Sequence, residues 1–117
     1  MKSIVSLFAL GLATVATAAA PAPDLSLEQR TALRCSAAFA IVSAVQEKGG
    51  AKEYPPLGGR GQEFFVRSSA RVMDEAQLDR AGITAVMQFE AEDPANTPGR
   101  LDAIMPACLS LLDASGV

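Results

Sequence analysis

The chain of 117 residues has no histidine and no tryptophan, and it contains only one tyrosine and two cysteines. Without histidine it lacks the side chain most used for proton transfer near neutral pH and the commonest protein ligand of transition metals. Its 13 Asp and Glu residues outnumber its 10 Lys and Arg residues, which gives a net charge of -3 and no broad basic surface. We therefore expect no nucleic-acid binding, no cofactor, no bound metal and no enzymatic activity.

The N-terminal segment has the pattern of a secretory signal peptide. Lys2 supplies an early positive charge, residues 4–13 are almost all apolar, and residues 16–20 are small. A retained membrane anchor would need roughly 20 consecutive apolar residues. Because Thr14 and Thr17 interrupt a shorter run, we expect the segment to be cleaved and to leave no membrane span.

Two cleavage sites fit the run of small residues. Cleavage after Ala18 is preferred to cleavage after Ala20, because the latter would place Pro21 directly at the scissile bond. The mature protein is then expected to be periplasmic or secreted. The expected organisation is a signal peptide at 1–18, a linker at 19–25 and a single helical domain at 26–117.

Cys35 and Cys108 are the only cysteines. Export would carry them to a compartment where disulfides form and persist, and two cysteines allow a single intramolecular pairing. We predict a structural disulfide that, in the chain-entropy model, stabilises the fold by roughly 4 kcal/mol. A catalytic or redox thiol is the weaker alternative, because there is no Cys-x-x-Cys motif and both cysteines have apolar neighbours.

The spacing of apolar residues predicts an all-α fold, a small four-helix bundle in which the disulfide joins the first and last helices. Ser26 and Gln29 form a capping-box pattern before the first helix. Asp79 is the predicted N-cap of the third helix, with a hydrophobic staple between Leu78 and Ile83. The predicted helices cover residues 27–48, 62–76, 80–91 and 98–114.

The first predicted helix is apolar on nearly every side, which is typical of a helix at the centre of a bundle. In the second helix, pairs of opposite charge four residues apart, at 63 and 67 and at 71 and 75, indicate a solvated face. The predicted buried faces contain Phe65, Ser69, Val72, Met73 and Ala76 in the second helix, Ile83, Val86, Met87 and Phe89 in the third, and Leu101, Ile104, Met105, Cys108, Leu111 and Leu112 in the fourth.

Glycine and proline leave some helix boundaries open. Gly82 lies near the start of the third predicted helix, so a single bent helix over 62–91 is an alternative to two helices. Residues 93–96 are turn-like, and the Thr-Pro pair at 97–98 predicts the N-cap and first residue of the last helix. Pro106 lies inside that helix and is expected to kink it.

A glycine-rich segment precedes the second predicted helix, with five glycines and two prolines within residues 49–61. Glycines next to a helix start can form a phosphate cradle, because the first helical amides and the helix dipole attract anions. The spacing matches neither a Walker loop nor the dinucleotide fingerprint, so a flexible connector is favoured. Should the segment bind an anion, the candidate residues are Gly59, Arg60, Gly61 and Arg67.

Three further patterns have a structural interpretation that we favour over a functional one. The Tyr-Pro-Pro-Leu segment at 54–57 could present a polyproline II strand to a partner, but a stiff strap packed on the bundle is favoured. Glu90, Glu92 and Asp93 lack the spacing of a calcium loop and are interpreted as the solvated end of a helix. Core packing is favoured over copper binding for three methionines, Met73, Met87 and Met105.

Three segments of the sequence are RCSAAFA at 34–40, FFVRSSARVM at 64–73 and MPACL at 105–109. They resemble segments of small, exported, two-cysteine helical proteins of Gram-negative bacteria. The resemblance covers most of the expected mature chain. It implies export and an all-helical fold, and it carries over no activity and no site residue.

Two functions stay open at the level of the sequence. The first is a non-catalytic protein-interaction or envelope-stress module whose partner is another envelope protein, favoured by export, the helical core and the lack of catalytic side chains. The alternative is small-ligand or anion binding at the glycine-rich loop 58–61 and the second helix. A hydrolase or redox enzyme is a third and weaker hypothesis, because it would need a thiol that the disulfide removes.

Overall fold

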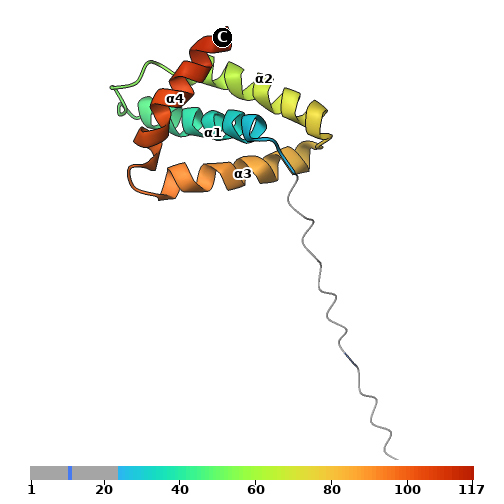
Figure 1. The fold of residues 1–117 in the computed structure, drawn as a ribbon. Coiled ribbons are helices and arrows are strands. Elements are labelled where there is room, and N and C mark those ends of the chain that lie inside the picture. The colour runs from blue at the N-terminus through green and yellow to red at the C-terminus, as the bar shows by residue number, and fades with distance from the viewer. Residues whose placement is uncertain (1–10, 12–23) are drawn as a thin grey trace, which may run out of the picture.

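A computed structural model describes residue 11 and residues 24–117. The described part of the chain contains four helices and no strand, which confirms the predicted all-α bundle (Figure 1). The predicted signal peptide at 1–18, apart from Gly11, lies outside the described residues, as do both cleavage sites and most of the linker. The helices are α1 (Leu27–Glu47), α2 (Gly58–Ala76), α3 (Arg80–Asn96) and α4 (Arg100–Ala114).

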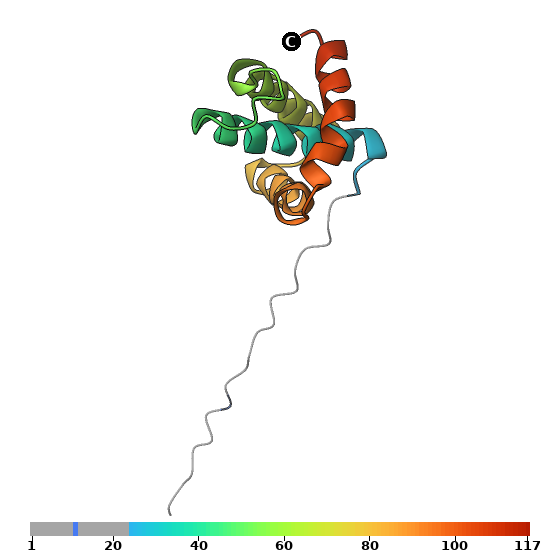
Figure 2. The same cartoon turned by 90° about the vertical axis from the view of Figure 1, so that its left-hand side faces the viewer.

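Helix α1 is the centre of the bundle, as its apolar composition predicts. Helices α2 and α3 lie on opposite sides of it, and α4 crosses it (Figures 1 and 2). Such a helix has to be apolar around most of its circumference, because other helices cover several of its faces. Its buried residues are Ala32, Leu33, Cys35, Ser36, Ala37, Ala38, Phe39 and Val42.

Two apolar clusters hold the helices together. The larger cluster joins α1, α2 and α4, and in it the rings of Phe39 and Phe64 meet edge to face with centroids 5.3 Å apart. This geometry is the one that aromatic quadrupoles favour. The smaller cluster joins α1, α2 and α3, and its buried members are Leu33, Val72, Ile83 and Val86.

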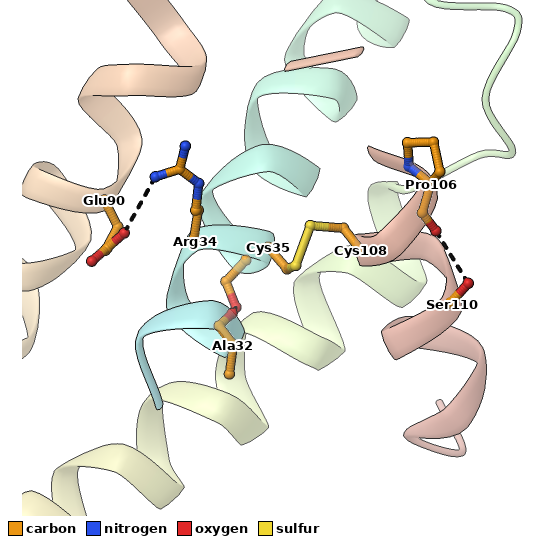
Figure 3. The surroundings of a disulfide bond; sticks show 8 residues. Ala32, Arg34, Cys35, Glu90, Pro106, Cys108 and Ser110 are labelled. Atoms are coloured by element: carbon orange, nitrogen blue, oxygen red, sulfur yellow. Dashed lines mark hydrogen bonds and ion pairs between the residues drawn. A yellow bond between two sulfur atoms is a disulfide. The ribbon is translucent and has the colours of Figure 1, made fainter. Parts of the chain in front are cut away.

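The predicted disulfide joins Cys35 of α1 to Cys108 of α4, which confirms the pairing of the first and last helices. Both cysteines are only 2% exposed. Figure 3 shows that the neighbouring Arg34 points away from the disulfide, towards Glu90 of α3. Adjacent residues of α1 therefore attach it to α4 by a covalent bond and to α3 by an ion pair.

The predicted N-caps of α1 and α3 are confirmed. The hydroxyl of Ser26 accepts a hydrogen bond from the backbone N–H of Gln29, and the Gln29 side chain accepts one from the backbone of Ser26. At the start of α3, the Asp79 carboxylate accepts a hydrogen bond of 2.7 Å from the N–H of Gly82. Because Gln77 ends α2 in the left-handed conformation, with φ of 54°, residues 62–91 form two helices and not one.

The structure corrects two helix starts. Helix α2 begins at Gly58, so residues 58–61 form its first turn and are not part of a loop. Gly61 is buried there, and a Cβ atom at this position would come within 3.0 Å of the Cβ of Phe39. Helix α4 begins at Arg100 and not at 98, because Gly99 interrupts the helical path with a φ of 75°.

The turn predicted at 93–96 is wrong, because α3 continues to Asn96 with Pro94 buried inside it. The Thr97 hydroxyl and the Arg100 guanidinium both contact the Asp93 carboxylate. These contacts hold the last turn of α3 in place although Pro94 removes one backbone hydrogen bond. Thr97 accordingly ends α3 and is not the N-cap of α4.

The buried face of α2 differs in part from the prediction, which is correct for Val72 and wrong for Phe65. The buried residues are Gly61, Phe64, Ser68 and Val72, whereas Phe65 is 37% exposed and Val66 is 56% exposed. The close approach of α1 and α2 at Gly61 determines which face of α2 is buried, because it places Phe64 against Phe39. Phe89 of α3, also predicted to face inward, is 63% exposed.

The predicted apolar stripe of α4 and the core position of Met105 are confirmed, and Met73 and Met87 pack against the smaller cluster.

The segment between α1 and α2 is a strap tied to the bundle, as favoured above. Gln46 binds its backbone, since the side-chain amide donates to the carbonyl of Pro55 at 2.9 Å and its oxygen accepts from the N–H of Leu57 at 3.0 Å. Leu57 is 1% exposed, and Tyr54 packs against the larger cluster while its hydroxyl donates to Asp102 of α4. The hydrogen bond to this carboxylate raises the pKa of Tyr54 to about 12.

This hydrogen bond gives a first testable prediction. Tyr54 is the only tyrosine and there is no tryptophan, so the absorbance of phenolate reports on this residue alone. We expect a spectrophotometric titration to give a midpoint near pH 12 in the folded protein, and Asp102→Asn to return it towards the ordinary value of about 10. Because the folded pKa is raised, the stabilisation is complete below pH 10 and is lost as pH rises towards 12.

The matched control for this titration is Asp113→Asn, which removes another carboxylate of α4 that pairs with Arg60 and not with Tyr54. The control should leave the midpoint unchanged. A midpoint near 10 in the folded wild-type protein would show that the Tyr54 hydroxyl does not donate to Asp102.

Candidate functional site

The four anion-site candidates have different surroundings in the structure. Gly59 is exposed in the first turn of α2, while Gly61 is buried against Phe39. Arg60 donates to Asp113 at 3.0 Å and to the backbone carbonyl of Val117 at 2.9 Å, so its guanidinium is bound to the C-terminal part of α4. Arg67 lines a cleft between α1, α2 and α4, and Gly61 lines a second hollow that is described below.

That cleft has a volume of about 390 Å³ and lies between α1, α2 and the C-terminal part of α4, which pass beside each other in Figure 1. Helix α2 contributes residues spaced three and four apart, a pattern that places them on one face of a helix. The residues that line the cleft are Glu28, Thr31 and Ala32 of α1, Phe64, Arg67, Ser68 and Arg71 of α2, and Leu111, Ala114, Ser115 and Val117 from the C-terminal part.

Two arginines form the charged part of this cleft. Arg67 pairs with Glu63 at 2.6 Å and Arg71 pairs with Glu75 at 3.7 Å, so both predicted i,i+4 pairs are present. The carboxylates lie one turn outside the two arginines along the helix. The prediction of a solvated face is therefore incomplete, because the same two arginines also form one wall of the cleft.

Ser68 is the most buried of the polar residues that line this cleft, with an exposure of 5%. The neighbouring Ser69 has a buried hydroxyl without a hydrogen-bond partner among the described residues, which costs about 1–3 kcal/mol. By contrast, the hydroxyl of Ser36 in α1 donates to the carbonyl of Ala32 at 2.8 Å.

A second hollow, the α1–α2 groove, lies on another part of α2 and has a volume of about 440 Å³. The exposed side chains of Phe65 and Val66 line it, and of the described part of the chain Glu47 is the one charged residue that does. The other residues that line it are mostly small or apolar: Ser36, Phe39, Ala40, Ser43, Ala44, Leu57, Gly58, Gly61 and Gln62.

The acidic cluster of α3 is not simply a solvated helix end, which corrects the sequence-based interpretation. Glu90 is 5% exposed and lies 3.4 Å from the Nε of Arg30 and 3.9 Å from a guanidinium nitrogen of Arg34. Glu92 is exposed, as expected. In the described part of the chain, no group of three or more acidic or cysteine side chains is placed to hold a metal ion.

Asp93 extends this charged network from α1 to the start of α4. Its carboxylate pairs with Arg34 and with Arg100, the latter at 3.1 Å. The hydrogen bond from Thr97 and then that from Arg34 hold the pKa of Asp93 below its ordinary value of 3.8. The network therefore contributes stability above that value and loses it as pH falls through the lowered pKa of Asp93.

The sequence did not predict that Arg71 and Ser68 line a cleft, and it did not predict the α1–α2 groove. The one available signal was the sequence Glu63, Arg67, Arg71 and Glu75, in which two like charges lie four residues apart. Such a pair of like charges lowers the stability of a helix by a few tenths of a kcal/mol unless an anion binds both side chains. Neither cysteine is available as a nucleophilic thiol, because both are in the disulfide.

In comparisons with known proteins, no family model, no curated protein and no solved structure matches the chain. Among the described residues, none of the helices has the length and apolar character needed to cross a membrane. The function has to be argued from the two hollows.

Proposed function

We propose that the protein is an exported, non-catalytic interaction module that binds an apolar helix of another envelope protein in the α1–α2 groove. Export is supported by the signal-peptide pattern of the sequence and by the disulfide, which is characteristic of oxidising compartments. The observation that carries the binding proposal is the exposure of Phe65 and Val66 beside an apolar groove of about 440 Å³.

The shape of the groove favours a helix as the occupant. Ala40, Ser43 and Ala44 of α1 and Gly58 of α2 line it, and their small side chains allow another backbone to approach closely. Phe65 and Val66 then supply larger apolar contacts beside these small residues. An amphipathic helix laid in an apolar groove is a recurrent mode of peptide recognition.

The charge of the groove indicates the flanks of the partner helix. Among the residues that the structure describes, Glu47 is the only charged one that lines it, and no Lys or Arg does. A partner whose apolar positions are flanked by Lys or Arg would place opposite charge next to Glu47. A second copy of this chain would bring two Glu47 carboxylates to the same interface, and like charges across an interface are unfavourable.

The test is site-specific photo-crosslinking in the envelope of cells that export the protein. A benzophenone side chain at position 66 is expected to capture one partner through an apolar helix flanked by basic residues. The matched control is the same side chain at position 89, because Phe89 is 63% exposed but lies on α3, outside the groove. The control should not capture this partner.

Binding of the identified partner helix can then be measured with purified protein. Phe65→Ser is expected to weaken the affinity at least tenfold, as for a well-packed aromatic contact, whereas Phe89→Ser should change it less than twofold. The proposal is wrong if position 89 captures the same partner equally, if only a second copy of the chain is captured, or if Phe65→Ser leaves the affinity unchanged.

A further inference from the structure

We infer that the cleft between α1, α2 and α4 is a binding site for a small monocarboxylate with an apolar body. The cleft does not coincide with the groove assigned above to a protein partner, since none of the described residues lines both hollows. It also differs from the glycine-rich segment, none of whose residues lines it. The inference therefore stands independently of the proposed protein interaction.

The two arginines of α2 supply the contact for the carboxylate. Arg67 and Arg71 are four residues apart, so they are neighbours on the helix surface. Their own partners, Glu63 and Glu75, lie on the far sides of the pair, which leaves like charges adjacent in the middle. An arginine has five N–H donors, and one contact with a carboxylate leaves others free for a second anion.

Ser68 adds a hydrogen-bond donor to the same part of the cleft. It lies between the two arginines in the sequence and lines the cleft, with an exposure of only 5%. A carboxylate held by the arginines would accept a hydrogen bond from this hydroxyl.

The rest of the cleft favours an apolar body for the ligand. Ala32, Phe64, Leu111 and Ala114 line it from three helices, and no lysine or further arginine of the described residues does. The volume of about 390 Å³ lies within the range of roughly 300–1,000 Å³ seen for small-molecule sites. Such sites combine mostly apolar walls with a few polar groups that fix the orientation of the ligand.

Glu28 limits the charge that the ligand can carry. It lies in the first turn of α1 and lines the same cleft, so a negative charge is present in addition to the two arginines. A ligand with two negative charges, such as the phosphate dianion, would be repelled by Glu28 more strongly than a monocarboxylate. The combination of two cations, one anion and apolar walls favours a single carboxylate at one end of an apolar chain.

The test is an NMR titration of the mature, disulfide-bonded protein with octanoate as the probe. We expect saturable shifts of the backbone amides of residues 28–32, 64–71 and 111–115. Octylamine, which has the same chain and the opposite charge, should cause no shifts there, and neither should inorganic phosphate. Acetate, which keeps the carboxylate and lacks the chain, should bind at least tenfold more weakly.

Substitutions in the cleft test which side chains contact octanoate. Arg67→Gln with Arg71→Gln is expected to weaken octanoate binding at least tenfold, because charge-assisted hydrogen bonds are lost. Ser68→Ala is expected to weaken it about fivefold. The matched control is Arg80→Gln, which removes an exposed arginine at the start of α3 and should change the affinity less than twofold.

Thermal unfolding of each variant confirms that it is folded before binding is compared. The inference is overturned if octanoate causes no saturable shifts in the cleft, if octylamine or phosphate binds as tightly, or if the double arginine variant binds like the wild type. It is also overturned if the shifts map to the α1–α2 groove, a result that would leave the proposed protein interaction untouched.

Discussion

Replacing Cys35 and Cys108 together with alanine is expected to lower the free energy of unfolding by about 4 kcal/mol. The two cysteines are separated by 73 positions, so the disulfide closes a loop that contains most of the folded domain and restricts the unfolded chain strongly. For a domain of this size, a loss of 4 kcal/mol corresponds to a fall in Tm of roughly 15–30 °C. Since net stabilities are about 5–15 kcal/mol, the disulfide supplies a large share.

The measurement is urea unfolding followed by circular dichroism, with the mass of the unreduced protein establishing that the disulfide has formed. The wild-type protein with reductant provides the control, because it keeps both sulfur atoms and loses only the covalent bond. Its unfolding curve should approach that of the double variant. If the reduced and oxidised wild-type proteins unfold at the same urea concentration, the disulfide does not have the stabilising role given to it here.

The parts of the fold that the sequence predicts well are those fixed by local chemistry. The capping box of Ser26 with Gln29 needs only residues three apart, and the cap of Asp79 on Gly82 is equally local. The disulfide was predictable for a different reason, because two cysteines allow a single pairing. The central place of α1 followed from apolar residues on nearly all of its sides.

The errors in the fold arise where contacts between helices outweigh local propensity. Glycines favour a loop at 58–61, yet the structure has helix there because only a residue without Cβ lets Phe39 approach Gly61 so closely. Proline favours a turn near 94, yet the ion pairs and the hydrogen bond of Asp93 extend α3 to Asn96. Neither effect can be seen in the spacing of residues within one helix.

The candidate cleft was even less accessible to sequence reasoning. Arg67 was identified for a different site, and Arg71 was assigned to a solvated face because its charge pattern fits exposed i,i+4 pairs equally well. Ser68 has no pattern that marks it, since only the packing of α1 and α4 against α2 buries its hydroxyl. A hollow formed by three helices depends on their arrangement, which hydrophobic periodicity does not determine.

The second large effect is expected at the buried carboxylate of Glu90. Arg34→Met keeps much of the length of the side chain but removes a cation that contacts both Glu90 and Asp93. Because Glu90 is only 5% exposed, its charge is left poorly compensated, and we expect a loss of about 3 kcal/mol in the free energy of unfolding. Arg30, whose Nε lies 3.4 Å from Glu90, limits the loss but is itself about half exposed.

The reverse substitution separates this effect from a simple loss of contact. In Glu90→Met the guanidinium groups of Arg30 and Arg34 stay hydrated because they are partly exposed, and Arg34 keeps its ion pair with Asp93. The expected loss in the free energy of unfolding is therefore below about 1 kcal/mol. Arg34→Met combined with Glu90→Met should therefore be more stable than Arg34→Met alone, because no buried carboxylate remains. Urea unfolding of the three variants and the wild type completes the thermodynamic cycle. Equal losses for the two single variants, with no recovery in the combined one, would show that the buried charge of Glu90 does not depend on Arg34.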